Sequence, residues 1–349
     1  MPDYLPYVET YLQIFRKNQI DYKIVCWNRT DKLYNEDDKT IVFNKPIDNN
    51  SSYFHKLREN YMFYRFCKNN INSKDYDMVI VPTMSLGFIL SSYLKKSFKD
   101  KYIIDIRDCS SIFNNRIVKR VLSNLLTKAK CVVISSKGFE RYLPERDYLV
   151  VHNTTYDSFS KTSKPKQTLY EDENVINILT MGLLRLEPNI VMMGQLGNNS
   201  KFHLSLAGAG DYASQLEKHI KEKKYKNVDF HGWYDKKDEA GMIEASDFVS
   251  IYLTHDQNSD LLMSNRFYLS ALHRRPMIVN ENTFQAEICM KFGLGVVLTE
   301  RQSFEKQILD FCKSYNPQKY EEGCNAFLNE VKNDMRIFES TIVGVLGIG

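Results

Sequence analysis

The sequence predicts an α/β protein with two Rossmann-like domains that face each other across a cleft. Strand-like apolar runs alternate with helical segments almost throughout, which is typical of parallel sheets covered by helices. The chain has 349 residues, of which 43% are hydrophobic, enough to fill two cores. A polar stretch at 158–173 interrupts the alternation and predicts a linker between domains at 1–157 and 174–349.

The first half is predicted to contain five strands with helices between them. The strands are expected at Tyr22–Trp27, Asp77–Pro82, Tyr102–Ile106, Cys131–Ile134 and Tyr148–His152, and helices at Tyr53–Cys67 and Asn115–Lys130. The start differs from this pattern, because Tyr4–Lys17 already has helical periodicity. A Rossmann-like domain normally opens with a strand and a glycine-rich turn. We therefore expect the first strand of this domain to be missing or atypical.

The second half repeats the alternation with six predicted strands. These are Val175–Thr180, Phe202–Ala207, Val228–Phe230, Phe248–Leu253, Pro276–Asn280 and Gly295–Leu298, with helices such as Tyr212–Lys224 and Asn265–His273 between them. Two such units in tandem predict that ligands bind at the carboxyl ends of the strands, in the cleft between the domains.

Composition excludes several classes of protein. The chain has 47 basic and 43 acidic residues, a net charge of +4, and lacks the strong basic bias of nucleic-acid binders. No pair among the seven cysteines has C-x-x-C spacing, which favours reduced thiols over disulfides or a zinc site. The sequence shows no signal peptide and no apolar run long enough to span a bilayer. These features predict a cytoplasmic protein whose membrane contact, if any, is peripheral.

The stretch from Ser264 to Val279 holds the clearest candidate for a binding site. Ser264 is a typical helix N-cap residue, which places Asn265 and Arg266 in the first helical turn. The free N–H groups and positive dipole end of a helix favour a bound phosphate, and Arg266 would add charge-assisted hydrogen bonds. The same residues also fit an ordinary cap followed by a surface arginine, so both interpretations stay open.

This stretch resembles a segment of capsular and exopolysaccharide glycosyltransferases related to family four, which have the two-domain GT-B architecture. The family pattern S/P-N-K-L-Y-x-A-x-x-x-x-K-P-I-x-V is matched here from Ser264 to Val279. Further segments resemble the family in the same order along the chain. They are Ile104-Asp105-Ile106-Arg107-Asp108, Ile134-Ser135-Ser136-Lys137-Gly138-Phe139, Val151-His152-Asn153, Met181-Gly182-Leu183-Leu184-Arg185, Leu206-Ala207-Gly208-Ala209-Gly210 and Asn227-Val228-Asp229-Phe230-His231-Gly232-Trp233.

The resemblance implies that the C-terminal domain holds a nucleotide sugar as donor substrate, with no further cofactor and no metal. Gly182 and Arg185 would meet the diphosphate. Gly208 and Gly210 would keep the neighbouring loop slim. The remaining implied donor-site residues are Trp233 and Tyr234 beside the base, and Ser264, Asn265 and Arg266 at the phosphates. A tight turn at Gly208-Ala209-Gly210 and simple packing of Trp233 remain the structural alternatives.

The N-terminal domain would hold the acceptor. Asp105, Arg107 and Asp108 end a predicted strand, where sites of this architecture gather. Asp108 is the candidate base that orients or deprotonates an acceptor hydroxyl, and Arg107 the candidate contact for an acceptor phosphate. A structural Asp–Arg pair at a strand end is an equally good interpretation of the same residues.

The chain departs from family four at two glutamates spaced by seven residues, whose positions are Leu262 and Leu269 here. The second of these glutamates binds the donor ribose, so Glu281 and Asp260 become candidates for that contact. The capsular subgroup often lacks both glutamates. The absence nevertheless favours one alternative, a non-catalytic GT-B subunit that regulates a partner transferase.

The resemblance implies glycosyl transfer from a nucleoside diphosphate sugar to a lipid-linked glycan in surface polysaccharide synthesis, with retention of anomeric configuration. A sugar-nucleotide epimerase of the same fold is the other alternative. The expected partners are the nucleotide sugar and a lipid-linked acceptor at the inner face of a membrane. The helix at Asn115–Lys130 mixes basic and apolar residues, which suits anionic lipid or, more simply, a core helix with a solvated basic face.

Overall fold

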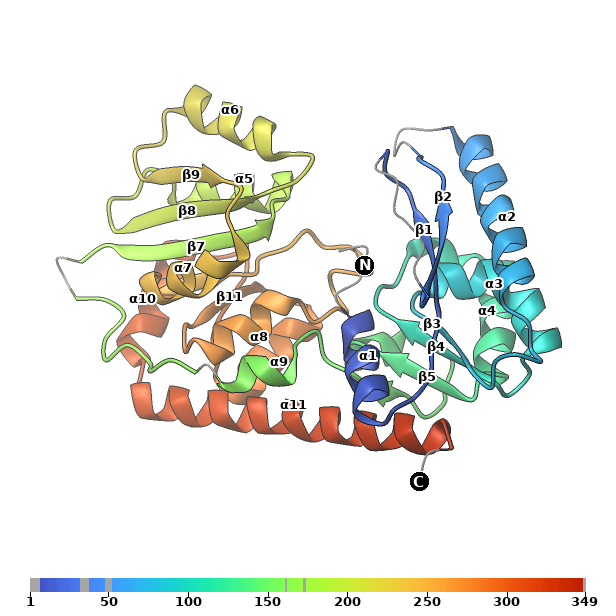
Figure 1. Ribbon diagram of the computed structural model, residues 1–349. Helices are drawn as coiled ribbons and strands as arrows, with labels where there is room; N and C mark the ends of the chain where they lie inside the picture. The colour runs from blue at the N-terminus through green and yellow to red at the C-terminus, as the bar shows by residue number, and fades with distance from the viewer. Residues whose placement is uncertain (1–6, 32–37, 48–51, 161, 172–173, 348–349) are drawn as a thin grey trace. The chain divides into compact units, whose positions relative to one another are not determined.

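The computed structural model describes residues 7–31, 38–47, 52–160, 162–171 and 174–347. The chain forms two compact units: residues 1–151 together with 335–349, and residues 152–334 (Figure 1). Both are α/β units with parallel sheets, as the sequence predicts. The boundary lies before His152 rather than at the polar stretch 158–173, and the C-terminal residues group with the first unit rather than the second.

The first unit contains the predicted strands and one more. Its helices are α1 (Val8–Lys17), α2 (Tyr53–Asn70), α3 (Met84–Ser97) and α4 (Arg116–Thr127). Its strands are β1 (Ile24–Asn28), β2 (Thr40–Asn44), β3 (Val79–Val81), β4 (Tyr102–Ile106), β5 (Cys131–Ile134) and β6 (Leu149–Val150). The sequence analysis did not predict β2.

The strands of the first unit form two separate sheets. β1 pairs with β2, and a second sheet has the order β3-β4-β5-β6, with all pairs parallel. A doubly wound sheet places its first strand between the second and the fourth. Within the described residues this unit begins with α1, so the two pieces correspond to that order without its central strand. The helix predicted at Tyr4–Lys17 is α1, which begins at Val8. Residues 4–6 of that prediction lie outside the described residues.

The second unit has one continuous sheet with the order β12-β11-β10-β7-β8-β9. Its strands are β7 (Ile176–Leu183), β8 (Phe202–Ala209), β9 (Val228–Gly232), β10 (Phe248–Ser250), β11 (Met277–Asn280) and β12 (Gly295–Leu298). Its helices are α5 (Leu186–Leu196), α6 (Ala213–Lys223), α7 (Glu239–Ala245), α8 (Asn265–Leu272), α9 (Phe284–Phe292) and α10 (Phe304–Ser314). Read from its first strand, this is the doubly wound order 3-2-1-4-5-6.

The long C-terminal helix α11 (Pro317–Val345) contributes to both units. Its last turns pack in the first unit, where Phe338 and Ile342 are buried in one cluster with Tyr11 and Ile103. The rings of Tyr11 and Phe338 meet edge to face at 5.4 Å. This burial is the physical reason why residues 335–349 belong to the first unit, although they follow the second in sequence.

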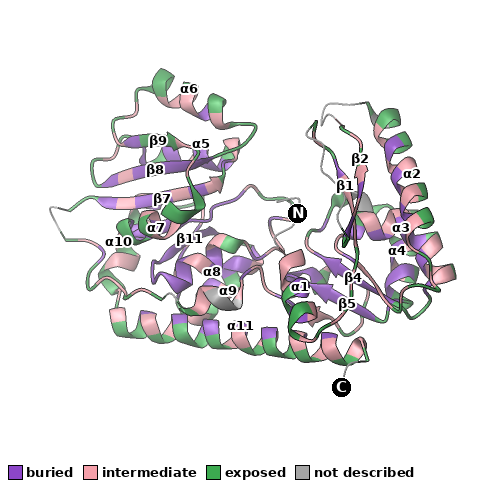
Figure 2. Cartoon of the chain, in the orientation of Figure 1, coloured by how far each residue is buried: buried purple, intermediate pink, exposed green. Residues whose placement is uncertain are grey.

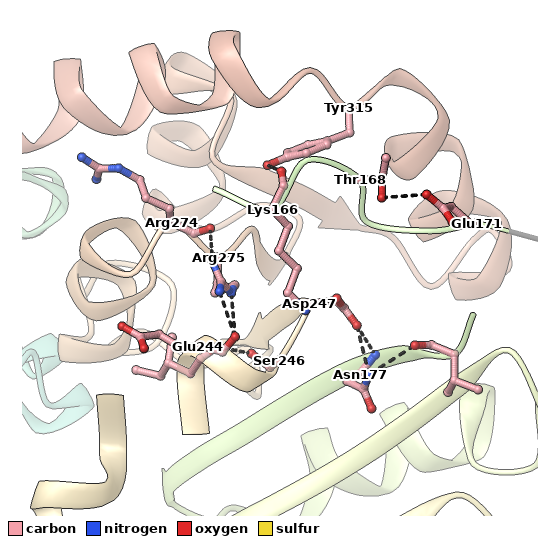
Figure 3. Close-up of polar contacts among 12 residues, drawn as sticks. Lys166, Thr168, Glu171, Asn177, Glu244, Ser246, Asp247, Arg274, Arg275 and Tyr315 are labelled. Atoms are coloured by element: carbon pink, nitrogen blue, oxygen red, sulfur yellow. Dashed lines mark hydrogen bonds and ion pairs between the residues drawn. The ribbon is translucent and has the colours of Figure 1, made fainter. Parts of the chain in front are cut away.

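The described part of the predicted linker packs against the second unit. Arg275, which is 7% exposed, donates hydrogen bonds to the carbonyl oxygens of Lys164 and Glu244 at 3.1 and 2.8 Å. Lys166 forms an ion pair with Asp247 at 2.5 Å. Figure 3 draws Arg275 beside Glu244, and Lys166 near Asp247. The stretch is therefore an ordered part of the second unit in its described residues; positions 161, 172 and 173 of the prediction lie outside them.

Candidate functional site

The strand order of the second unit alone predicts where a ligand-binding crevice lies. β7 pairs with β8 on one side and with β10 on the other, so the strand order reverses direction between β7 and β10. Ligands of doubly wound sheets bind outside the carboxyl ends of the strands at this point. The loop from β7 to α5 and the loop from β10 to α8 both leave the sheet there. Arg185 lies on the first loop, and Arg266 lies at the start of α8.

Arg185 and Arg266 lie near enough at this crevice for the charge of Arg185 to act on Arg266. Arg266 donates a hydrogen bond from Nη1 to the carbonyl oxygen of Met181, at the end of β7, over 3.0 Å. Burial of its guanidinium, together with the positive charge of Arg185, lowers the pKa of Arg266 to about 10. Arg266 therefore remains charged near neutral pH, and its repulsion from Arg185 leaves a place that favours an anion.

The nearest acidic partner of Arg185 is held by its own turn. Asp256 Oδ2 lies 3.9 Å from Arg185 Nη1, at the limit of an ion pair. The Asp256 carboxylate accepts hydrogen bonds from the backbone of Asn258 and from the backbone and hydroxyl of Ser259, at 2.7 to 2.9 Å. These hydrogen bonds and Arg185 lower the pKa of Asp256, although burial opposes them. The sequence analysis missed this residue, but the Asp256-x-Asn258-Ser259 turn is a recognisable signal.

The predicted glycines differ in what their conformation requires. A Cβ on Gly208 would lie 1.9 Å from the carbonyl oxygen of Gly182, so only glycine lets the ends of β7 and β8 approach this closely. Gly210 is nearly as confined, since its Cβ would lie 2.9 Å from the Leu183 side chain. Gly182 has φ +89° and open space within 4 Å, which leaves its backbone accessible at the crevice.

Helix α8 begins at Asn265, as the sequence predicts, with Ser264 as its N-cap residue. The predicted capping bond is not formed, however. The Ser264 side chain accepts no backbone N–H, and its own N–H donates instead to Gln285 Oε1 at 3.1 Å. Asn265 is exposed. The Phe267 N–H donates to the Ser264 carbonyl oxygen at 3.0 Å, whereas the Ser264 hydroxyl caps none of the N–H groups at this helix start.

The two aromatic candidates at the end of β9 lie in different environments. Trp233 is 71% exposed, so it does not pack in the core as the structural alternative supposed. Tyr234 Oη donates to Glu239 Oε1 at 3.3 Å. Burial and Glu239 raise the pKa of Tyr234 to about 12, while the nearby charge of Arg266 opposes the increase. Tyr234 thus lies near enough to Arg266 for the arginine's charge to act on it.

The two candidates for a ribose contact already have hydrogen-bond partners. Glu281, directly after β11, accepts a hydrogen bond from the Thr299 hydroxyl at 2.7 Å. Asp260 lies 2.6 Å from His255 Nδ1, and His255 Nε2 lies 3.1 Å from the Asn280 amide. Because Asn280 donates there, His255 carries its proton on Nδ1 and donates it to Asp260. His255 and Asn280 were not predicted, and no sequence motif marks them.

The three acceptor-site candidates of the first unit lie at the end of β4, with Asp105 inside the strand and Arg107 and Asp108 directly after it. Asp105 is fully buried, accepts a hydrogen bond from Tyr11 Oη at 2.8 Å, and has Oδ1 at 2.7 Å from Arg107 Nε. Burial of the Arg107 guanidinium opposes its charge, but the Asp105 carboxylate outweighs burial and raises the pKa of Arg107. The Arg107 guanidinium also lies over the Tyr7 ring, 4.6 Å from its centroid. The geometry has the form of the structural Asp–Arg pair. Asp108 is the exposed member, although partial burial of its carboxyl raises its pKa.

A hollow of about 420 Å³ lies at the opposite edge of the second sheet, where β7 begins. Its lining includes Lys166, Thr168, Asn177 and Asp247, several of which appear in Figure 3. Asp247 accepts from the Asn177 backbone at 2.7 Å and pairs with Lys166, so the charges in the hollow neutralise each other. The described residues contain no group of three or more potential metal-ligating side chains.

Comparison with solved structures agrees with the two-unit fold. No protein-family model and no curated protein sequence matches the chain. Sucrose-phosphate synthase from Thermosynechococcus elongatus matches with a TM-score of 0.68 and 11% identity, over 97% of this chain and 91% of that one. HepE of Anabaena in complex with UDP matches with a TM-score of 0.59 and 16% identity, over 88% and 86%.

The glycosyltransferase WaaG, which is involved in lipopolysaccharide biosynthesis, matches with a TM-score of 0.60 and 10% identity, over 98% of this chain and 96% of that one. These proteins are GT-B glycosyltransferases, and the chain therefore has the GT-B fold. At such identities the likeness establishes the fold alone.

Proposed function

We propose that the protein is a glycosyltransferase that uses a nucleoside diphosphate sugar as donor. The observation that carries the proposal is the arginine pair of Arg185 and Arg266 at the point where the strand order of the second sheet reverses. The GT-B fold supports it, as does the presence of UDP in the solved structure of HepE. UDP is therefore the nucleoside diphosphate that we expect to bind most tightly.

In this proposal the second unit stabilises the leaving group. The diphosphate would take the place between the two guanidinium groups, and the start of α8 would add backbone N–H donors. Negative charge grows on the diphosphate as the glycosidic bond to it breaks. Cations fixed in advance at that position lower the barrier more than they stabilise the bound ground state. Trp233 and Tyr234 would border the base.

The first unit would bind the acceptor, whose hydroxyl attacks the donor sugar. We propose Asp108 as the group that accepts its proton, because it is the exposed carboxylate at the end of β4 and its pKa is raised. Asp105 and Arg107 would hold the strand end in place through their mutual contacts. We further propose that the acceptor is a lipid-linked glycan in surface polysaccharide synthesis. Transfer would retain the anomeric configuration and would need no metal ion.

The test is a thermal-shift and titration series with UDP, GDP, dTDP and CMP. A ligand that binds the folded state raises its melting temperature. We expect UDP to stabilise the protein, and Arg266→Gln to weaken its binding about tenfold or more, as loss of a charged hydrogen bond does. Lys218→Gln, an exposed residue on α6, is the matched control and should leave binding unchanged. Equal affinity in the Arg266 variant and the control would remove the basis of the proposal.

Product analysis separates the enzyme from its alternatives. A transferase consumes UDP-sugar only when an acceptor is present, apart from slow hydrolysis. An epimerase would change the sugar of the donor without any acceptor. A regulatory subunit would bind the nucleotide and convert nothing. Insensitivity of the transfer rate to a chelator is the expected outcome if the arginine pair alone neutralises the leaving group.

A further inference from the structure

Helix α2 of the first unit exposes large apolar side chains in a pattern that does not serve its own core. Phe54, Leu57 and Tyr61 are 81%, 55% and 61% exposed. Their spacing of three and four residues places them on one side of the helix. Single exposed apolar residues are ordinary on protein surfaces, whereas a row of them on one helix marks an interaction surface. Figure 2 shows exposed residues recurring along α2.

The opposite side of α2 is fixed to the rest of the unit. Phe63 and Cys67 are 6% and 2% exposed. The Phe63 ring lies 5.2 Å from Trp27 and 5.7 Å from Phe43, on strands β1 and β2. Glu59 is fully buried and lies 3.0 Å from Lys45 Nζ. An aromatic layer and a buried ion pair thus set the rotation of the helix, so the apolar row faces outward and cannot turn inward without breaking both.

The outward side of α2 is also basic. Arg58, Arg65 and Lys68 are exposed and share the arc of the apolar row at 100° per residue. The acidic residue of this helix, Glu59, is the buried one. The result is a surface about 21 Å long, the rise over the 14 residue steps from Phe54 to Lys68, with the apolar and aromatic side chains in its first part and mainly basic ones in its last. We call it the α2 face, defined by Phe54, Leu57, Arg58, Tyr61, Arg65 and Lys68.

We propose that the α2 face docks on an anionic membrane surface. Aromatic side chains favour the interface between headgroups and acyl chains, and basic side chains next to them pair with anionic lipid. Among the described residues no helix is long and apolar enough to cross a bilayer, so the contact is with the surface. The proposal rests on the proposed function only in its purpose, since a transferase with a lipid-linked acceptor gains from lying at the membrane.

Charge complementarity selects this partner over a second copy of the chain. Two α2 faces in contact would gather six basic residues, three from each copy, in one interface. That repulsion has no acidic residue on the α2 face to offset it. Exposed basic residues on α3 and α4 of the same unit also favour an anionic partner; they are Lys96, Arg116, Lys119 and Arg120.

The structure assigns this role to α2 rather than to the helix singled out in the sequence. Leu122, Leu125 and Leu126 of α4 are buried, so its apolar stripe forms core contacts. Its basic residues are solvated, and Ile117 is the exposed apolar residue among them, at 76%. α4 therefore fits the simpler interpretation of a core helix with a basic outer side, and adds charge but little apolar area to a membrane contact.

The test is sedimentation of the full chain with phosphatidylcholine vesicles, with and without phosphatidylglycerol. We expect binding to the anionic vesicles that weakens as salt rises. The variant Phe54→Ser/Leu57→Ser/Tyr61→Ser should bind about tenfold more weakly or worse. The variant Arg58→Glu/Arg65→Glu/Lys68→Glu should lose the preference for anionic lipid.

Matched controls separate the α2 face from general surface properties. Lys218→Glu/Lys221→Glu/Lys223→Glu reverses three basic residues on α6, and Met290→Ser/Ile337→Ser removes two exposed apolar side chains elsewhere. Both should bind vesicles as the original chain does. Equal loss in the controls, no binding by the unmodified chain, or self-association through the α2 face without vesicle binding would each overturn the proposal. Binding of UDP, followed by thermal shift, is independent of these results and tests the proposed function separately.

Discussion

The two units end their central strands in opposite electrostatic states. In the first unit Asp105 and Arg107 at the end of β4 neutralise each other, with Asp105 fully buried and 2.7 Å from Arg107. In the second unit Arg185 after β7 and Arg266 at the start of α8 repel each other, and the Asp256 carboxylate is 3.9 Å from Arg185. The same kind of strand end thus holds the structure together in the first unit and, in the proposed function, receives a ligand in the second.

The comparison teaches that residue type at a strand end does not decide its role. Both places carry an arginine and an aspartate, and both were candidates from sequence. The distance from the arginine to a carboxylate separates them, at 2.7 Å for Arg107 and 3.9 Å for Arg185. Removing a charged side chain that is paired with a carboxylate of the protein lowers stability. Removing one that has no close carboxylate instead weakens the binding of an anionic ligand.

The largest expected effect comes from breaking the neutral pair of the first unit. Asp105→Asn leaves the Arg107 guanidinium buried with no carboxylate, and should lower the free energy of unfolding by about 3–5 kcal/mol. Urea denaturation measures it. Asp108→Asn, three residues along the chain and exposed, should change stability little. If Asp105→Asn instead left stability intact and abolished only transfer, the pair would have to be reassigned as catalytic.

A smaller effect should come from the glycines that shape the crevice in the second unit. Gly208→Ala forces a Cβ to within 1.9 Å of the Gly182 carbonyl oxygen, so β7 and β8 must separate, at a cost of about 3 kcal/mol. Gly182→Ala meets no atom within 4 Å and should cost about 1 kcal/mol, from its backbone conformation alone. Urea midpoints of the two variants measure the difference, and equal losses would contradict the close approach of the two strands.

The smallest effect concerns the pH dependence of transfer. Burial raises the pKa of Asp108, so as pH falls its carboxylate is protonated earlier than an ordinary aspartate. If Asp108 accepts the acceptor proton, the rate should fall on the acidic side at a pH above the usual aspartate range. Asp108→Asn should remove both the activity and this limb, while Asp100→Asn, an exposed control in the same unit, keeps them. A limb unchanged in the Asp108 variant would exclude it as the base.

Sequence reasoning predicted the strands well wherever they were continuous apolar runs. Cys131–Ile134 and Gly295–Leu298 have the predicted bounds. It missed β2, since Thr40–Asn44 is a short run among polar neighbours, and it expected a cap from Ser264 that does not form. His255 and Asn280 escaped because their contact joins residues 25 apart in the chain, which no local spacing encodes. Asp256 escaped although its turn with Asn258 and Ser259 is a local signal.

The sequence by itself determined the alternation of strands and helices, the two α/β units, and the positions of arginines and glycines at the ends of strands. These follow from local periodicity and from the chemistry of each residue type. The tertiary structure alone decided that the first sheet is split, that 335–349 returns to the first unit, and that α2 exposes its apolar row. Strand pairing, burial and charge neutralisation depend on residues far apart in the chain, so their outcome exists only once the chain has folded.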